Sequence, residues 1–295
     1  MVPNFAIQGR VSRDADERLG LKAGTPVSYR AGDQPNNALS LKVLQPGEVA
    51  ATAGTSGVVY GVGQAAVYDP ESRVNTFVHV NHRPEAPRYG TLLCVNCTAI
   101  LNSWLRHNAV SLGDRALSYD QMNELAATVP PGADGLVVLP YGNGAERTPG
   151  NRNPGASVHA LDFNRHSRAH LLRAAQEGIV FALQDGLEIM RAMGLSIETF
   201  RAGAANMFLS PLFAQAFATV TGAPVELYNT DGSQGAARGA GIGAGVYDLE
   251  SAFAGLQAVR RVEPNPALAP AYAEAYGRWR ETLRRELGSA PRTLA

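Results

Sequence analysis

The sequence has few cysteines, few aromatic residues and no surplus of charge. Two cysteines in 295 residues exclude a disulfide framework. No run of about 18 apolar residues occurs, so no membrane span is expected, and the first ten residues lack an apolar core of signal-peptide length. The 26 basic and 26 acidic residues cancel, which argues against nucleic acid or an anionic membrane as a partner. These absences predict a cytosolic protein.

The chain is long, and it is rich in glycine. At 295 residues it can bury a full core as one large domain or two small ones, and its 31 glycines indicate many tight turns. The first half is mostly strand-like and the second half alternates helix and strand, which is typical of an α/β enzyme. A domain boundary is expected near Pro46-Gly47.

Hydrophobic periodicity and turn residues predict the individual elements. Strands are expected at 25–29, 48–53, 58–62, 73–80, 89–94, 136–141, 197–202 and 225–228. Helices are expected at 12–20, 36–43, 98–107, 119–128, 167–193, 211–221, 235–247, 249–256 and 270–287.

Asp33 is the first candidate for chemistry. It stands in Gly32-Asp33-Gln34, shortly after the strand expected at 25–29. A carboxylate at the end of a strand can act as a general base. The same residue can instead cap the helix expected after Pro35, or form an Asx-turn, and spacing alone favours this structural role.

Gly54-Thr55-Ser56-Gly57 is the second candidate. A turn without bulky side chains can bring backbone N–H groups and hydroxyls close to a phosphate. The alternative is an ordinary hairpin turn. The stretch is not a nucleophile elbow, because Val58 stands where Gly-x-Ser-x-Gly needs glycine, and no Gly-Lys-Ser/Thr follows as in a Walker A loop.

Two further glycine-containing stretches are open to more than one interpretation. Gly203-Ala204-Ala205-Asn206 lies between a predicted strand and a predicted helix, where an open α/β sheet can bind a nucleotide, or it is a plain strand–helix turn. The glycines between 235 and 245 do not fit Gly-x-Gly-x-x-Gly. They are expected to let their helix pack closely on a neighbour.

Three side-chain pairs are further candidates for chemistry. Cys94 and Cys97 could form a redox pair but are expected to be buried thiols, and without a second pair they make a poor zinc site. His79 and His82 lie three residues apart with no third ligand set by spacing, so no metal site is assigned. Glu146 and Arg147 are expected to pair within a structured loop.

Seven segments of the chain form an ordered set. They are Gly24-Thr-Pro-Val, Gly32-Asp33-Gln34, Pro46-Gly47-Glu48, Gly54-Thr55-Ser56-Gly57-Val58, Leu139 to Pro149, Arg173 to Leu183, and Asp231 to Ala240. In order and spacing they resemble the FGGY carbohydrate kinases, and within that family most of all the xylulose kinases. The stretches 73–82 and 206–211 resemble a xylulose-kinase subgroup rather than glycerol kinases.

The resemblance implies an α/β fold of the actin/Hsp70-like (RNase H-like) type. Two domains enclose a cleft, with the sugar against the first and ATP with Mg²⁺ against the second. Asp33 would be the general base and would contact the sugar together with Gln34. No residue is assigned as a metal ligand, since Mg²⁺ would screen the β- and γ-phosphates. The implied nucleotide contacts are Gly54, Thr55, Ser56 and Gly57 at the phosphates, and Gly203, Ala204 and Asn206 near the adenosine.

Two departures from the family pattern shape the expected domains. The family begins with a domain that carries an early phosphate hairpin, and Met1 aligns with the last part of that domain. The chain is therefore expected to be the C-terminal portion of such a kinase, with the N-terminal domain mostly missing. Residues 1–46 would end the sugar-binding domain, 47–287 would form the nucleotide-binding domain, and 288–295 would be a tail. The adenosine loop, which has consecutive glycines in the family, keeps only Gly203.

The expected reaction is transfer of a phosphoryl group from ATP to D-xylulose, giving D-xylulose 5-phosphate and ADP. One alternative is a catalytically silent nucleotide-binding fragment, or half of a split kinase. A second is a kinase for another ketose or polyol, and a third is a thiol redox protein that uses Cys94 and Cys97. The expected macromolecular partner is a missing N-terminal half or a second copy of the chain.

Overall fold

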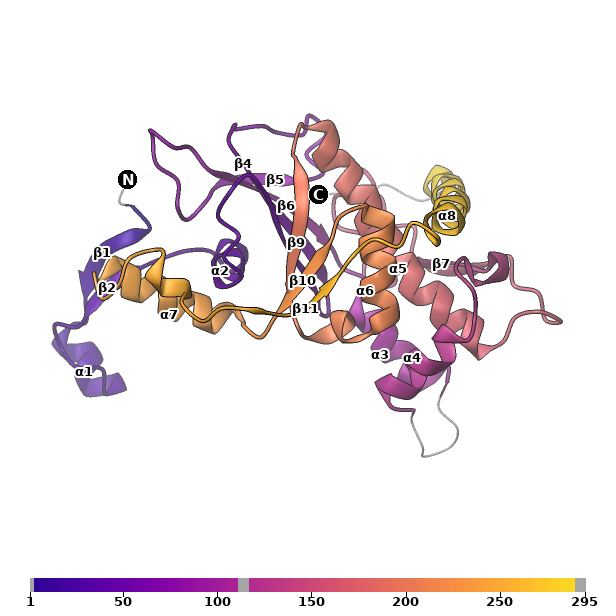
Figure 1. Cartoon of the computed structure of the whole chain (residues 1–295), viewed down its shortest axis with the longest axis horizontal. Helices are drawn as coiled ribbons and strands as arrows, with labels where there is room; N and C mark the ends of the chain where they lie inside the picture. Colours follow the sequence, from indigo (N-terminus) through magenta and orange to yellow (C-terminus); the bar gives the residue numbers. More distant parts are fainter. Residues whose placement is uncertain (1–2, 111–116, 290–295) are drawn as a thin grey trace.

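The computed structural model of the chain describes residues 3–110 and 117–289, except the side chain of Ser289. A central sheet has helices α5 and α6 on one side and α2 and α7 on the other (Figure 1). Most of the tail expected at 288–295 lies outside the described residues. Among the helices that are described, none is long and apolar enough to cross a membrane.

The described residues form strands, α-helices and short 3₁₀ turns. The strands are β1 (Phe5–Arg10), β2 (Pro26–Tyr29), β3 (Gly47–Ala53), β4 (Gly57–Gly63), β5 (Asn75–Val78), β6 (Tyr89–Val95), β7 (Val137–Pro140), β8 (Ala156–His159), β9 (Ile197–Gly203), β10 (Val225–Tyr228) and β11 (Ala258–Val262). The α-helices are α1 (Arg13–Leu19), α2 (Asp33–Ser40), α3 (Ala99–Asn108), α4 (Tyr119–Ala127), α5 (Arg168–Ala192), α6 (Pro211–Thr221), α7 (Gly232–Gly243) and α8 (Ala269–Ser289). Short 3₁₀ turns are η1 (Ala133–Gly135), η2 (Asn206–Leu209) and η3 (Ser251–Phe253).

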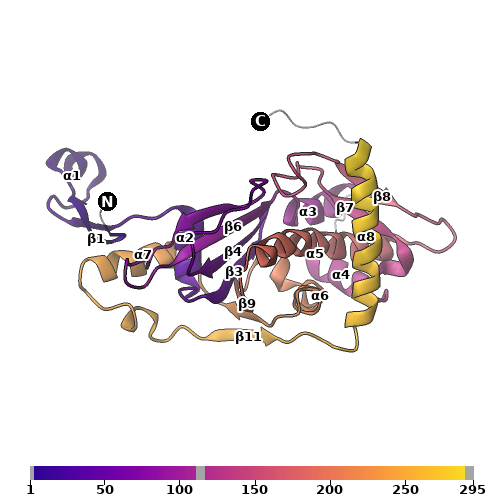
Figure 2. The same cartoon turned by 90° about the horizontal axis from the view of Figure 1, so that it is seen from above.

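The central sheet has the strand order β11-β10-β9-β3-β4-β6-β5. Strands β3, β4, β6 and β5 are antiparallel neighbours, whereas β3, β9 and β10 run parallel, and β11 pairs antiparallel with β10. Two separate pairs, β1-β2 and β7-β8, complete the strands of the described residues. Figure 2 shows β1 and α1 at one end of the molecule and α8 at the other.

The face of the sheet toward α5 and α6 holds the larger core. Side chains alternate along a strand, so Val49, Ala51 and Ala53 of β3 point into this core while Ala50 points to the other face. α5 is a 25-residue helix buried along most of its length, because it packs against α3, α4, α6 and α8 as well as the sheet. The helix expected at 167–193 is thereby confirmed.

The opposite face of the sheet carries α2, and α7 packs on α2 and β2 through its glycines. A Cβ on Gly239 would lie 2.7 Å from the Tyr29 ring, and a Cβ on Gly243 would overlap the carbonyl oxygen of Ser28. One on Gly235 would lie 2.5 Å from the carbonyl oxygen of Asn36. The expectation that these glycines allow close helix packing is confirmed.

Several expected elements were wrong or missed. Segment 249–256 is not a helix, since only η3 forms there and Gly255 adopts a left-handed φ of 80° that ends the turn. The strand that follows, β11, was missed because it alternates weakly and lies at the sheet edge. β1 and β8 were missed as well. α2 begins at Asp33 rather than at Asn36, with Pro35 in its first turn.

His79 and His82 are not arranged as metal ligands. His79 is fully buried, and its Nε2 lies 3.0 Å from the carbonyl oxygen of Val43, which can only accept, so Nε2 carries the proton. Its Nδ1 then accepts from the hydroxyl of Tyr60 at 3.0 Å. His82 Nδ1 accepts from the backbone N–H of Arg88 at 3.2 Å. Each ring therefore serves the local hydrogen-bond network.

Burial of His79 predicts a pH-dependent stability. Burial lowers the pKa of His79 from its ordinary value of 6.5 to about 4. Between these values the unfolded chain binds a proton that the folded chain does not, so the free energy of unfolding should decrease as the pH falls through this window. The full effect is on the order of 3 kcal/mol. Urea unfolding at pH 7 and pH 5, together with an NMR titration of the His79 ring, measures it; a His79 midpoint near 6.5 would contradict it.

Candidate active site

The predicted nucleotide segments lie at one edge of the central sheet. β3, β9 and β10 are parallel neighbours, so their carboxyl ends meet at the same edge. Gly54–Gly57 follows β3, Gly203–Asn206 spans the end of β9, and Thr230 with Asp231 follows β10. In open α/β sheets this edge is where ligands bind.

The turn Gly54–Gly57 joins β3 to β4 and is held against the start of α3. The carbonyl oxygen of Gly54 accepts from the backbone N–H of Ala99 at 2.7 Å and from the hydroxyl of Thr98. A Cβ on Gly57 would overlap Cγ2 of Thr98, so this position requires glycine. The turn is thus a hairpin turn, as one interpretation predicted, but with a packing constraint that an ordinary hairpin lacks.

The same turn presents free hydrogen-bond donors. Within the described residues, no hydrogen bond engages the backbone N–H of Thr55 or Ser56 or the hydroxyl of Thr55. Thr55 is exposed and Ser56 half-buried. Unpaired N–H groups in a small-residue turn are the donors that a phosphate group requires. The residues present therefore fit a phosphate chain.

The segment Gly203–Asn206 lies beside the turn Gly54–Gly57. Asn206 has a left-handed φ of 54°, and its Nδ2 would lie 3.6 Å from a Cβ on Gly54. Gly203 passes close to the chain that follows β10, because a Cβ on it would lie 3.4 Å from the carbonyl oxygen of Thr230. Ala204 donates its N–H to the carbonyl of Tyr228, the last residue of β10, at 2.8 Å. Residues separated by about 150 positions in the sequence thus form one surface at the end of the sheet.

Asp33 is the first residue of α2, and its side chain is exposed. Gly32 is the N-cap, so Asp33 does not cap the helix, although its Oδ1 accepts from the backbone N–H of Gln34 at 2.8 Å. The side chain of Gln34 donates to Oδ2 at 3.3 Å. The carboxylate is therefore oriented by Gln34 and remains accessible from solvent.

α2 carries Asp33 to the same edge of the sheet through its contact with α7. Nδ2 of Asn36 donates to the carbonyl oxygen of Gly232 at 2.6 Å, so the first turns of α2 and α7 adjoin. Asp231 caps α7 by accepting from the N–H groups of Ser233 and Gln234, at 2.9 and 3.1 Å. The hydroxyl of Ser233, which donates to the same carboxylate at 2.6 Å, lowers the pKa of Asp231 most, and the backbone N–H groups lower it further. A continuous series of contacts thus links Gly203, Thr230, the start of α7 and the helix of Asp33.

A set of hydrogen-bonded side chains adjoins the turn Gly54–Gly57 (the phosphate turn, after its predicted role). The sequence did not predict this set. Oγ of Ser56 donates to Oδ1 of Asn96 at 3.1 Å, and Nδ2 of Asn96 donates to Oε1 of Glu146 at 2.7 Å. Glu146 has a left-handed φ of 52°, which is uncommon for a non-glycine residue and often marks a functional site. The expected pair of Glu146 with Arg147 was wrong, because Arg147 donates to Oδ1 of Asn75 instead.

The thiol groups of Cys94 and Cys97 both have a raised pKa. Burial raises the pKa of the Cys94 thiol, and the negative charges of Glu146 and Asp33 raise it further. Burial also raises the pKa of Cys97, which is fully buried. Because the thiolate is the reactive form, neither cysteine is suited to redox chemistry at neutral pH.

A magnesium ion at this site would be held mainly by phosphate oxygens of the nucleotide rather than by a set of protein ligands. In the part of the chain that the structure describes, no cluster of three or more histidine, cysteine or acidic side chains could hold a metal. Mg²⁺ is commonly bound by one or two carboxylates together with substrate phosphates.

Known proteins resemble this chain in sequence and fold. Residues 49–247 match the FGGY family of carbohydrate kinases, C-terminal domain. A xylulose kinase of Haemophilus influenzae is 29% identical over 199 residues, which cover 66% of this chain and 38% of that protein. An L-xylulose/3-keto-L-gulonate kinase of Escherichia coli is 29% identical over 299 residues, covering 96% and 55%. The crystal structure of xylulose kinase from Rhodospirillum rubrum superposes with a TM-score of 0.82 at 28% identity, covering 96% of this chain and 56% of that one.

The chain therefore spans about half the length of the relatives it matches. The structural match confirms the expected α/β, actin/Hsp70-like fold and fits the C-terminal domain of these kinases. The domain limits at 46 and 287 stay predictions. Since the family match covers more than half of the described chain, this protein belongs to the FGGY family of carbohydrate kinases.

Proposed function

We propose that the chain serves the ATP-dependent phosphorylation of D-xylulose, yielding D-xylulose 5-phosphate and ADP. The observation that supports this most is the meeting of three features at one sheet edge: a turn with free N–H donors, a neighbouring loop closed by Asn206, and an exposed carboxylate at Asp33. Phosphoryl transfer to a hydroxyl needs groups that bind the phosphates and a base beside them.

In the proposed mechanism Asp33 takes the proton of the attacking sugar hydroxyl. The hydroxyl oxygen forms a bond to the γ-phosphorus while the bond to the β,γ-bridging oxygen breaks, and ADP leaves with that electron pair. The backbone N–H groups of Thr55 and Ser56 hold the phosphates in place, and Gln34 orients the carboxylate. Magnesium, when bound to the phosphates, would neutralise the charge that develops there.

The identity of the sugar has its own test. The relatives include kinases named for xylulose and for L-xylulose and 3-keto-L-gulonate, and the resemblance of the sequence motifs to xylulose kinases supports D-xylulose as the substrate to test first. Coupled ADP-release assays with D-xylulose, L-xylulose, D-ribulose and glycerol rank the substrates by kcat/KM. A higher kcat/KM for any other sugar would replace D-xylulose in the proposal.

A second candidate is a nucleotide-binding module that is catalytically silent alone, or half of a split kinase. It is favoured by the chain spanning about half the length of its relatives. ATP titration by calorimetry separates the outcomes. Binding without turnover supports this second candidate, binding with turnover supports the kinase, and no binding at millimolar ATP contradicts both.

Asn96→Ala is expected to weaken ATP binding about tenfold, because it removes the side chain that connects Ser56 to Glu146 and leaves the phosphate turn less constrained. The KM for ATP should rise more than kcat falls. Asn108→Ala, on the exposed end of α3, is the matched control and should leave both unchanged. Equal ATP affinity in Asn96→Ala and the natural chain would show that the turn holds its shape without Asn96.

A further inference from the structure

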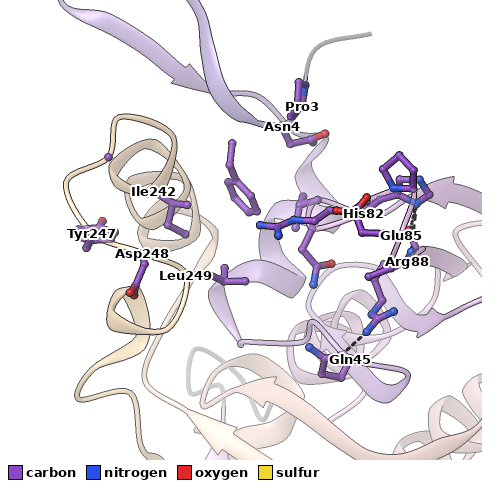
Figure 3. Close-up of a pocket in the computed structure, with 17 residues that line it drawn as sticks. Pro3, Asn4, Gln45, His82, Glu85, Arg88, Ile242, Tyr247, Asp248 and Leu249 are labelled. Carbon is purple, nitrogen blue, oxygen red and sulfur yellow. Dashed lines mark hydrogen bonds between the residues drawn. The ribbon is translucent and has the colours of Figure 1, made fainter.

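A cavity of 990 Å³ lies apart from the candidate active site. Four parts of the chain line it: the residues leading into β1, Gln45 before β3, the loop between β5 and β6, and the end of α7 with the chain that follows. Figure 3 shows Ile242 and Leu249 on one side, facing His82, Glu85 and Arg88 across the space. Its volume falls within the usual range for sites that bind small molecules.

The cavity is at the opposite edge of the sheet from the phosphate turn. Gln45, which lines it, directly precedes β3, whereas Gly54 follows the other end of that strand. Likewise Ile242 lines the cavity at the end of α7, whereas Gly232 at its start contacts Asn36 near Asp33. The 12 residues of α7 place these two ends about 18 Å apart. None of the predicted nucleotide or sugar residues lines the cavity.

One wall of the cavity is cationic. Arg83 is exposed, and no side-chain hydrogen bond or ion pair of its guanidinium occurs among the described residues. Arg88 donates to Oε1 of Gln45 at 2.8 Å and to the carbonyl of Pro87 at 2.9 Å, while its Nε is buried without a partner. Both guanidinium groups thus keep unused donor capacity beside the cavity.

Within the described residues, the acidic side chains of the cavity form no ion pair with these two arginines. Oδ1 of Asp248 accepts from the backbone N–H of Ser251 at 2.7 Å, and Figure 3 shows Asp248 turned away from the space. Glu85 is exposed and forms no ion pair with Arg83 or Arg88 within the described residues. Arg83 and Arg88 can therefore bind an external anion.

The remaining wall is apolar. Phe5 is held by stacking on Tyr29, with ring centroids 5.5 Å apart, and it lines the cavity together with Ile242 and Leu249. The C-terminal end of α7, which carries partial negative charge, lies on this same side. An anionic group would therefore be placed against the arginines, and a hydrocarbon part against Phe5.

We propose that this cavity binds a small amphipathic organic anion. Its anionic group contacts Arg83 and Arg88, and its hydrocarbon part packs against Phe5, Ile242 and Leu249. The site is distinct from the ATP site and accepts ligand whether or not ATP is present.

The fluorescent probe 8-anilinonaphthalene-1-sulfonate has the required chemistry, an aromatic body with one sulfonate. Titrated into the full chain, it should bind with one saturable site. Arg83→Ala should weaken this binding about tenfold, because it removes a charge-assisted contact, and Arg83→Lys should restore most of it. Since Arg83 is exposed, neither change should alter the thermal unfolding midpoint. Arg260→Ala, an exposed arginine on β11, is the matched control and should bind the probe as the natural chain does.

Two further measurements locate the probe. A second apolar groove beside α3 contains the exposed Trp104, so loss of binding in Trp104→Ala would place the probe there and overturn the proposal. Displacement of the probe by millimolar ATP would place it at the nucleotide turn and overturn the proposal too. Unchanged affinity in Arg83→Ala, or binding that does not saturate, would also contradict it. Retained binding in Trp104→Ala and with ATP present, together with the Arg83 effect, supports it.

Discussion

Asp33→Asn is expected to lower kcat for sugar phosphorylation by a factor of about 10² to 10⁴, which is the usual contribution of a general base. The asparagine keeps the shape of the side chain and can still interact with Gln34, but it cannot accept the proton of the sugar hydroxyl. ATP affinity should change little, because the phosphate turn is formed by other residues. The measurement is a steady-state ADP-release assay on the natural gene product.

The control for this substitution is a second exposed acid in the first turn of a helix. Asp120→Asn on α4 changes charge by the same amount without altering the candidate site, and kcat should remain that of the natural protein. Glu146→Gln tests the other carboxylate near Cys94 and should act mainly on the KM for ATP. A kcat for Asp33→Asn within a few-fold of the natural value would show that another group takes the proton.

Arg173→Met is expected to destabilise the fold by about 3 to 5 kcal/mol, because it leaves Glu177 as an unpaired buried charge. Nε of Arg173 donates to Oε1 of Glu177 at 2.6 Å, and both side chains are almost fully buried within α5. The same guanidinium donates to the carbonyl of Val129 at 2.9 Å and to the hydroxyl of Tyr272 at 2.8 Å. One side chain thus joins α5 to α8 and to the chain after α4.

The loss of stability in Arg173→Met should become smaller as the pH falls. Burial raises the pKa of Glu177 above its ordinary 4.5, and the charge of Arg173 opposes that rise. Without Arg173 the folded-state pKa should rise further, so the folded chain binds a proton that the unfolded chain lacks, and stability should increase as the pH falls toward 5. Urea unfolding at pH 7.5 and pH 5 measures this.

Tyr272→Phe is the matched control for that experiment. It removes only the hydroxyl that accepts from Arg173, leaves the ion pair intact, and should cost about 1 kcal/mol with no comparable pH dependence. A cost below 1 kcal/mol for Arg173→Met, or stability that does not rise on acidification, would show that Glu177 is solvated or re-paired in the variant.

Local patterns predicted much of the secondary structure. The apolar residues of 167–193 recur at helical spacing, and the structure has α5 there because that spacing places them on faces that pack against the sheet and other helices. α6 and β10 were predicted with their observed limits. The failures lie where tertiary contacts decide, as in β11, a five-residue strand that exists by pairing with β10.

The candidate site was predicted as separate pieces. Asp33, Gly54–Gly57 and Gly203–Asn206 were each ambiguous in isolation, and the order of motifs supplied the link between them. Their meeting depends on the parallel pairing of β3 with β9, in which Ala51 lies opposite Ala202. No local pattern encodes that register, because it is formed between residues about 150 positions apart.

By itself, the sequence determined the α/β class, the principal helices, the glycine face of α7 and the resemblance that the family match then confirmed. Tertiary structure alone decided that Asn96 connects Ser56 to Glu146, since an asparagine between a strand and a helix has no pattern that names its partners. It also decided that a large cavity lies at the far end of α7. Helix spacing sets which residues face a neighbour, but only packing of the whole chain sets which surfaces are left open.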